Sequence, residues 1–243
     1  MGSDRIFLTA EWRNLAMLNY EVDASLLLPF VPAGTELDRW NGRVFVSLVG
    51  FQFLQTRVWG LAIPFHANFD EVNLRFYVRR QEGGETRRGV VFIREIVPRR
   101  AIAVVARTLY HENYVALPMA HEIRSIGGGL LVAYRWRNDH DWSTMRLEVE
   151  GRPEAPGEGS HEQFITEHYW GYAAQPDGGC VEYRVTHPAW RVWKARQADF
   201  AGDVEELYGK DLASVLRGKP ASALLAEGSS VTVMRGHTCG PAG

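Results

Sequence analysis

The sequence contains very little lysine. It has 243 residues with 27 basic side chains, and only Lys194, Lys210 and Lys219 are lysines. None of them lies within the first 193 residues. Imine chemistry requires an amine that can lose its proton, so any such chemistry here must use one of these three lysines or the N-terminus. Lys194 is the only one within an apolar strand pattern, where we expect it to extend to solvent.

Cysteine is also scarce, with only Cys180 and Cys239 present. Two cysteines do not make the disulfide framework of a small secreted domain, and we expect Cys239 to lie in a frayed C-terminal tail. The N-terminus lacks the charged and apolar regions of a signal peptide. No apolar run reaches the roughly 20 residues of a membrane span. The default prediction is a cytoplasmic protein.

The charge balance shows no basic excess. The net charge is −2 and the isoelectric point is about 6.5. This argues against nucleic acid and an anionic membrane surface as partners. The length suits one large β domain, so we predict a single domain over residues 1–243 with an ordered core at about 5–235.

Strand patterns dominate the chain. Residues 13–22 fit a strand with apolar side chains on both faces, residues 44–54 are apolar on both faces, and Val72, Leu74, Phe76 and Val78 share one face of a strand at 71–80. Further strands are expected at 89–97, 121–126, 130–137, 143–150, 168–174, 180–186 and 189–200. Because hairpins are the main connection, the fold class is mainly β (α+β), an antiparallel barrel or curved double sheet with a few short helices.

Turn and cap residues punctuate these strands. Asn41-Gly42 predicts a tight turn, Asp23 can cap a short helix through Leu28, and Ser160 with Gln163 forms a capping box. Helical spacing recurs at 204–216, interrupted at Gly209. Two further expectations are a helix at 99–110 and a closing hairpin at 222–234 that turns at Gly228.

Several unusual stretches occur together along the chain. They are Leu48-Val49-Gly50-Phe51, Glu71-Val72-Asn73-Leu74-Arg75, Val97-Pro98-Arg99-Arg100, Glu167-His168-Tyr169-Trp170-Gly171-Tyr172 and His187-Pro188-Ala189-Trp190. In order and spacing they resemble the YqjF-like family of uncharacterised bacterial proteins, within the acetoacetate decarboxylase-like superfamily. The resemblance covers roughly residues 5–235 and implies the barrel fold of that superfamily.

The resemblance also implies where a decarboxylase site would lie. Acetoacetate decarboxylases have an Arg-Glu pair followed shortly by Pro-Lys-Lys, whose first lysine forms the imine and whose second lowers the pKa of the first. Here Arg94-Glu95 is followed by Pro98-Arg99-Arg100, with a shorter spacing. A guanidinium stays protonated and offers no comparable nucleophile, so imine-mediated decarboxylation at Arg99 is not expected.

Several candidate site residues have two interpretations. Arg99 and Arg100 either clamp a carboxylate or form a solvated charged pair. Glu71, Asn73 and Arg75 share one strand face, which either lines a pocket or, more commonly, faces water.

The remaining candidates are equally ambiguous. Arg94 and Glu95 point to opposite faces, and a structural salt bridge explains Glu95 as well as a catalytic role does. His111 lies in a polar turn and suits acid/base chemistry or a surface hydrogen bond. His168 shares a face with Trp170 and Tyr172, and Tyr183 shares one with His187; both sets suit a ligand pocket or a β core. The complete prediction is catalytic Glu71 and Glu95, with ligand binding by Arg75, Arg94, Arg99, Arg100, His111, His168, Tyr183 and His187.

Taken together, these features predict a site for a small carboxylate or other small anion inside the barrel, without imine chemistry. The alternative is a non-catalytic carrier or sensor on the same fold. No cofactor and no metal are predicted, because no histidine spacing supplies the converging ligands that zinc needs. A homo-oligomer is compatible with the tryptophans Trp12, Trp40 and Trp59 if they lie near an exposed face.

Overall fold

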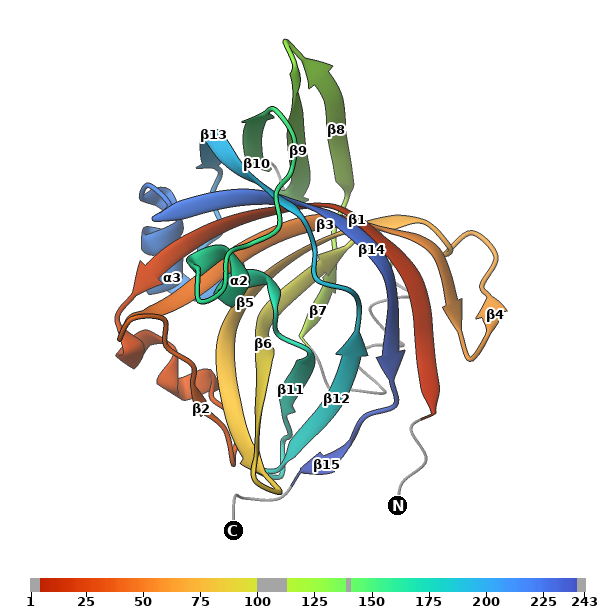
Figure 1. Ribbon diagram of the computed structural model, residues 1–243, viewed down its shortest axis with the longest axis vertical. Coiled ribbons are helices and arrows are strands. Elements are labelled where there is room, and N and C mark those ends of the chain that lie inside the picture. The colour runs from red at the N-terminus through yellow and green to blue at the C-terminus, as the bar shows by residue number, and fades with distance from the viewer. Residues whose placement is uncertain (1–4, 100–112, 139–140, 240–243) are drawn as a thin grey trace.

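The computed structural model describes residues 5–99, 113–138 and 141–239. Strands predominate, which confirms the mainly β prediction (Figure 1). None of the helices described is both long and apolar enough to cross a membrane. The strands are β1 (Ile6–Val22), β2 (Glu36–Leu37), β3 (Val44–Val58), β4 (Leu61–Ala62), β5 (Phe69–Glu82), β6 (Glu85–Val97), β7 (Tyr114–Ala116), β8 (Met119–Ile126), β9 (Gly129–Asn138), β10 (Asp141–Glu150), β11 (Trp170–Ala174), β12 (Cys180–Thr186), β13 (Val192–Ala201), β14 (Ser222–Met234) and β15 (His237–Cys239).

Seven strands close into a ring. Their order is β12, β11, β6, β5, β3, β1, β14, and β14 returns to β12 through a short pairing of Val185 with Val233 and Thr186 with Thr232. Most of these pairs are antiparallel, as the hairpin signals predict. The β6–β11 and β6–β7 pairs are parallel, so the sheet is mixed rather than purely antiparallel.

The outer face of the ring is covered by a second group of strands. β13 continues from β14 into β10, β9 and β8, which project at the top of Figure 1. Leu18, Leu48 and Leu74 belong to the same buried hydrophobic cluster as Tyr134 and Met145 of this group. Because the opposite face of β3 lies inside the ring, β3 is apolar on both faces, as its sequence predicts.

The described helices are short, and two of the helical segments begin where the capping signals predict. Asp23 accepts a hydrogen bond from the Ser25 amide at the start of a 3-10 turn, Ala24–Leu26, and a second turn follows at Leu28–Phe30. Ser160 accepts from the Gln163 amide at α2 (His161–Thr166). Helix α3 (Glu205–Arg217) is interrupted at Gly209, where φ is 78°. The helix expected at 99–110 lies almost wholly outside the described residues.

The prediction of a closing hairpin at 222–234 is wrong. The segment forms one continuous strand, β14, which pairs with β1 along its length. Gly228 has φ +80°, but its role is a close approach: a Cβ there would lie 2.0 Å from the carbonyl oxygen of Trp12. The glycine signal therefore marks contact between neighbouring strands rather than a turn.

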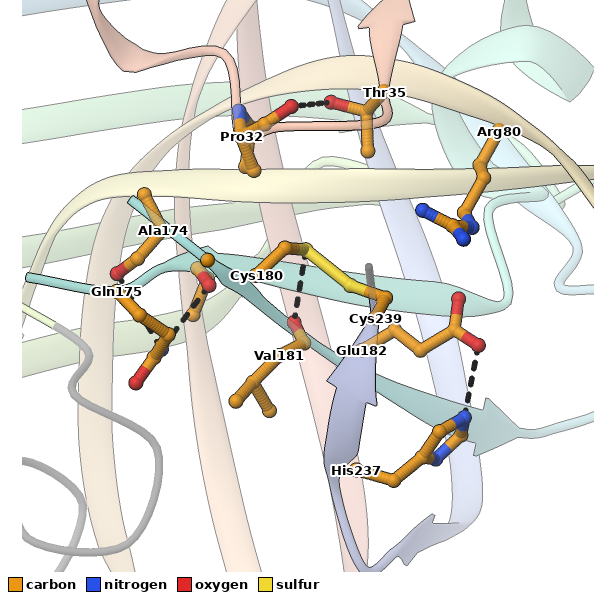
Figure 2. Close-up of a disulfide and its surroundings, with 12 residues drawn as sticks. Pro32, Thr35, Arg80, Ala174, Gln175, Cys180, Val181, Glu182, His237 and Cys239 are labelled. Carbon is orange, nitrogen blue, oxygen red and sulfur yellow. Dashed lines mark hydrogen bonds and ion pairs between the residues drawn. A yellow bond between two sulfur atoms is a disulfide. The ribbon is translucent and has the colours of Figure 1, made fainter. Parts of the chain in front are cut away.

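The two cysteines form a disulfide, contrary to the expectation of a frayed tail at Cys239 (Figure 2). β15 adds to the free edge of β12 and places Cys239 directly opposite Cys180, with 5.1 Å between the Cα atoms. Beside them His237 lies 2.9 Å from Glu182, which also accepts a hydrogen bond from Arg87. These contacts hold β15 against the ring.

Candidate functional site

A cavity of about 240 Å³ lies inside the ring. Residues from β1, β3, β5, β6, β11, β12 and β14 line it, because each of these strands turns one face inward. The lining is largely aromatic: Phe7, Trp12, Phe51, Phe53, Phe69, Phe92, Tyr114, Trp170, Tyr183 and Trp190. Such a lining, with a few polar groups, is typical of a small-molecule site.

The polar face of β5 points into this cavity. Glu71, Asn73 and Arg75 all line it, which decides between the two interpretations of this face in favour of the pocket wall. Glu71 is 2% exposed and accepts hydrogen bonds from the Asn73 amide at 3.0 Å and the Tyr114 hydroxyl at 3.2 Å. On the neighbouring strand, the buried Glu95 pairs in register with Asn73.

Arg75 brings a permanent positive charge to the cavity wall. Its Nη2 lies 3.3 Å from the Ile165 carbonyl oxygen and 4.0 Å from the Met17 sulfur, and its guanidinium lies 5.8 Å from the Tyr77 ring centre. Its buried Nε has no hydrogen-bond partner, and no described carboxylate forms an ion pair with it. No carboxylate among the described residues therefore balances the charge of Arg75.

His168 belongs to a buried chain of polar groups. It precedes β11, and its Nε2 lies 3.3 Å from Asp38 Oδ2, which also accepts from Arg88 Nε at 2.6 Å. Burial lowers the pKa of His168 to about 4, with the Arg88 charge adding to the effect and Asp38 opposing it. Burial works against ionisation of Asp38, but hydrogen bonds from His168 and Arg88 hold its pKa below the usual value.

His187 and Tyr183 complete the opposite wall. The His187 ring stacks on Trp190 with centroids 4.0 Å apart, and its Nδ1 lies 2.9 Å from the Pro188 carbonyl oxygen. Burial lowers the pKa of His187, and the Arg75 charge contributes. Tyr183 packs over Gly171, where a Cβ would lie 2.2 Å from the tyrosine ring. The glycine makes room for the aromatic side chain.

The structure gathers six of the ten predicted site residues. Glu71, Arg75, Glu95, His168, Tyr183 and His187 all line the cavity. Arg94 lies on the opposite face of β6 from Glu95 and is not part of the lining. Arg99 follows β6, is exposed and does not line the cavity either. Arg100 and His111 lie outside the described residues.

Other residues of the site escape sequence analysis. Tyr114 lies in a strand of only three residues, too short to show a period. Asp38 is separated from His168 by 130 positions, and no local motif connects them. A weak signal exists for Asp38: it stands beside a strand and is the only acid between Glu36 and Trp40.

The sequence matches a known family over most of its length. The family is DUF2071, an uncharacterized conserved protein, and the match covers residues 9–230. The chain belongs to this family. This DUF2071 protein is also 31% identical over 112 residues to the uncharacterized protein YqjF of Bacillus subtilis. That alignment covers 46% of the chain and 45% of YqjF, so it spans under half the length of either protein.

Solved structures share the fold of this DUF2071 protein. Acetoacetate decarboxylase from Legionella pneumophila superposes with a TM-score of 0.69 at 12% identity, covering 97% of this chain and 88% of the other. The enduracididine biosynthesis enzyme MppR, complexed with pyruvate, gives 0.66 at 13% identity, with 96% and 90% covered. An acetoacetate decarboxylase-like enzyme from Sphingomonas wittichii gives 0.64 at 12% identity, with 98% and 94% covered. At these identities the likeness establishes the acetoacetate decarboxylase-like fold and nothing more.

Proposed function

We propose that the protein binds a small carboxylate inside the ring, with the carboxylate at Arg75 and the apolar part among the aromatic side chains. The volume of the cavity, about 240 Å³, is a little smaller than the roughly 300–1,000 Å³ that is usual for ligand pockets, which favours a small ligand. Trp12, Phe51, Phe53 and Trp190 offer it flat apolar surfaces.

The charge of Arg75, which pairs with no carboxylate among the described residues, is the observation that carries the proposal. Three other arginines of the ring strands have carboxylate partners: Arg80 pairs with Glu82, Arg87 with Glu182 and Arg88 with Asp38. Arg94 shares with Arg75 a buried Nε without a described partner, but it does not line the cavity. A charge beside an apolar cavity is costly unless it is paired. A ligand carboxylate supplies the missing partner, and the planar guanidinium suits it.

Ligands of a structural neighbour agree with this chemistry. MppR has been solved with pyruvate and with the condensation product of pyruvate and imidazole 4-carboxaldehyde. Pyruvate is a small carboxylate. The shared fold supports a ligand of that class here, although the residues that bind it in this chain must be its own.

The proposal excludes an imine with lysine. Lys194 has a side chain that is 79% exposed and pairs with Glu162, and Lys210 and Lys219 are exposed. None of the three lines the cavity. Any chemistry would instead rely on Glu71 or Glu95 as acid or base and on charge stabilisation by Arg75.

A non-catalytic carrier or sensor is the second candidate. It is favoured by the lining, in which aromatic side chains outnumber groups capable of acid/base chemistry. The two candidates differ in turnover and not in binding. Ligand binding is therefore the claim to test first.

Calorimetric titration of Arg75→Met and Arg75→Lys with pyruvate, benzoate and phenylpyruvate tests the proposal. We expect Arg75→Met to weaken binding at least about tenfold and Arg75→Lys to retain part of the affinity, because charged hydrogen bonds contribute strongly in dry sites. Benzamide, which has the same ring and no charge, should not distinguish the variants.

Arg94→Met is the matched control, because Arg94 also has a buried Nε without a described partner but does not line the cavity. Its affinity for the carboxylates should equal that of the unmodified protein. An effect of Arg94→Met or Arg99→Met as large as that of Arg75→Met would contradict the proposal, as would equal binding by all variants. Borohydride trapping with acetoacetate should leave the protein mass unchanged.

A further inference from the structure

We infer that the carboxylate ligand also carries a hydrogen-bond donor, most simply a hydroxyl group, which is received by Nδ1 of His168. The inference rests on the proposed function and deepens it by naming the ligand class: a small hydroxy carboxylate with an apolar body. It arises from two acceptor atoms without a described partner, His168 Nδ1 and Asn73 Oδ1, which belong to residues that line the cavity.

The position of the proton on His168 follows from Asp38. A carboxylate accepts hydrogen bonds and does not donate them, so the imidazole nitrogen that faces Asp38 must carry a hydrogen. That nitrogen is Nε2, which lies 3.3 Å from Asp38 Oδ2. Arg88 donates to the same oxygen at 2.6 Å and helps to keep Asp38 ionised.

The second nitrogen of His168 is consequently an acceptor. Because the buried ring is neutral near pH 7, Nδ1 has a free lone pair on the side away from Asp38. It is buried and has no hydrogen-bond partner among the described residues. The side chain is 1% exposed, so bulk water does not reach it, and the residue lines the cavity.

Asn73 supplies an independent observation of the same kind. Its Nδ2 donates to the Glu71 carboxylate at 3.0 Å, which fixes the orientation of the amide and makes Oδ1 the remaining atom. Oδ1 is also a buried acceptor without a partner in the described part of the chain. Asn73 is two positions from Arg75 on the same face of β5.

The cavity lining thus includes the Arg75 guanidinium, which donates, and the residues that carry the acceptors His168 Nδ1 and Asn73 Oδ1. Arg75 matches a carboxylate, whereas His168 Nδ1 and Asn73 Oδ1 match a group that donates. The Arg75 charge contributes to lowering the pKa of His168, so the two side chains are near enough to interact. A hydroxyl on the same small molecule as the carboxylate satisfies both requirements. A keto acid, which has no such donor, leaves the acceptors unpaired.

The test compares three ligands of one shape: 3-phenyllactate, phenylpyruvate and 3-phenylpropanoate, which differ at a single position. We expect calorimetry to show 3-phenyllactate binding about tenfold or more tightly than 3-phenylpropanoate. His168→Phe should abolish this preference and leave the affinity for 3-phenylpropanoate nearly unchanged. His187→Phe should keep the preference. Because Nδ1 of His187 donates to the Pro188 carbonyl, its Nε2 is the competing acceptor in the lining, and loss of the preference in this variant would overturn the assignment to His168.

The outcomes separate this inference from the proposed function. If none of the three carboxylates binds, the proposed function fails and takes the inference with it. If all three bind with equal affinity, the inference alone is overturned. Should His168→Phe fail to fold, nitrogen NMR of the histidine-labelled, unmodified protein provides the answer. We expect 3-phenyllactate to shift the His168 Nδ1 resonance toward the hydrogen-bonded range. An Nδ1 resonance that does not respond would overturn the inference.

Discussion

At the scale of single residues, the burial of His168 couples the stability of the protein to pH. Its pKa is about 4 in the folded state, against an ordinary value of 6.5. Between these values the unfolded chain binds the proton and the folded protein does not. The stabilisation is therefore fully present above about pH 6.5 and is lost as the pH falls toward 4.

The expected change follows from this shift. Unfolding free energies from urea titrations should fall by up to about 3 kcal/mol between pH 7 and pH 4 because of His168. The lowered pKa values of His187 and His161 act in the same direction. The lowered pKa of Asp38 affects the unfolding free energy only below the ordinary aspartate pKa of 3.8, which is outside this pH range.

A variant isolates the part that belongs to His168. His168→Phe should flatten the pH dependence of the unfolding free energy between pH 4 and 7. An unaltered slope in His168→Phe would show that another group is responsible.

Residue patterns alone predicted which side chains of the candidate site share a strand face. Alternation placed Glu71 and Arg75 on one face and separated Arg94 from Glu95, because side chains of a strand alternate strictly. Which face is internal depends on ring closure, which no local pattern encodes. The family resemblance directed attention to Arg99, but this residue comes after the end of β6 and lies away from the cavity lining.

At the scale of elements, the contact between β14 and β1 depends on Gly228. We expect Gly228→Ala to destabilise the protein by roughly 3 kcal/mol or more, because a Cβ there overlaps the Trp12 carbonyl. Gly84→Ala is the matched control: its φ is +84°, close to the +80° of Gly228, but its Cβ would have nothing within 4 Å. It should cost only the conformational penalty of about 1–2 kcal/mol.

Urea unfolding of the two variants measures the difference. Equal losses would mean that backbone conformation alone explains Gly228 and that the close approach to Trp12 does not matter.

The elements themselves were predictable where the signal is local. Capping by Asp23 and Ser160, the turn at Asn41-Gly42 and the interruption at Gly209 all follow from a few neighbouring residues. Gly228 was misinterpreted because a glycine that avoids a neighbouring strand looks the same in sequence as one that makes a turn. The parallel pairing of β6 with β11 joins segments about 80 positions apart, and strand patterns do not specify such partners.

At the scale of the whole molecule, the disulfide ties the C-terminal strand to the ring. Cys180 and Cys239 are 59 positions apart and both are buried. Replacing both by serine should lower the unfolding free energy by about 2–4 kcal/mol, as expected for a loop of this size. Disulfides persist in oxidising compartments, so a disulfide in this protein counts against the argument for a cytoplasmic location that was based on its few cysteines. The cytoplasmic location stays a prediction.

Mass spectrometry after alkylation in denaturant, with and without reductant, checks this pairing. Without reductant neither cysteine should react, and with reductant both should. Free thiols in the unreduced, air-exposed protein would contradict it.

The predicted homo-oligomer also stays a prediction. Of the three tryptophans considered for it, Trp59 is the most exposed at 63%, and Trp12 packs inside the ring.

The central claim is that Arg75, inside the ring, receives the carboxylate of a small ligand. A crystal structure of the protein with 3-phenyllactate tests it most directly. The account predicts carboxylate oxygens within hydrogen-bond distance of the Arg75 guanidinium and the phenyl ring among the aromatic side chains of the cavity. A ligand bound at Arg99 with the cavity unfilled, or one whose carboxylate points away from Arg75, would contradict it.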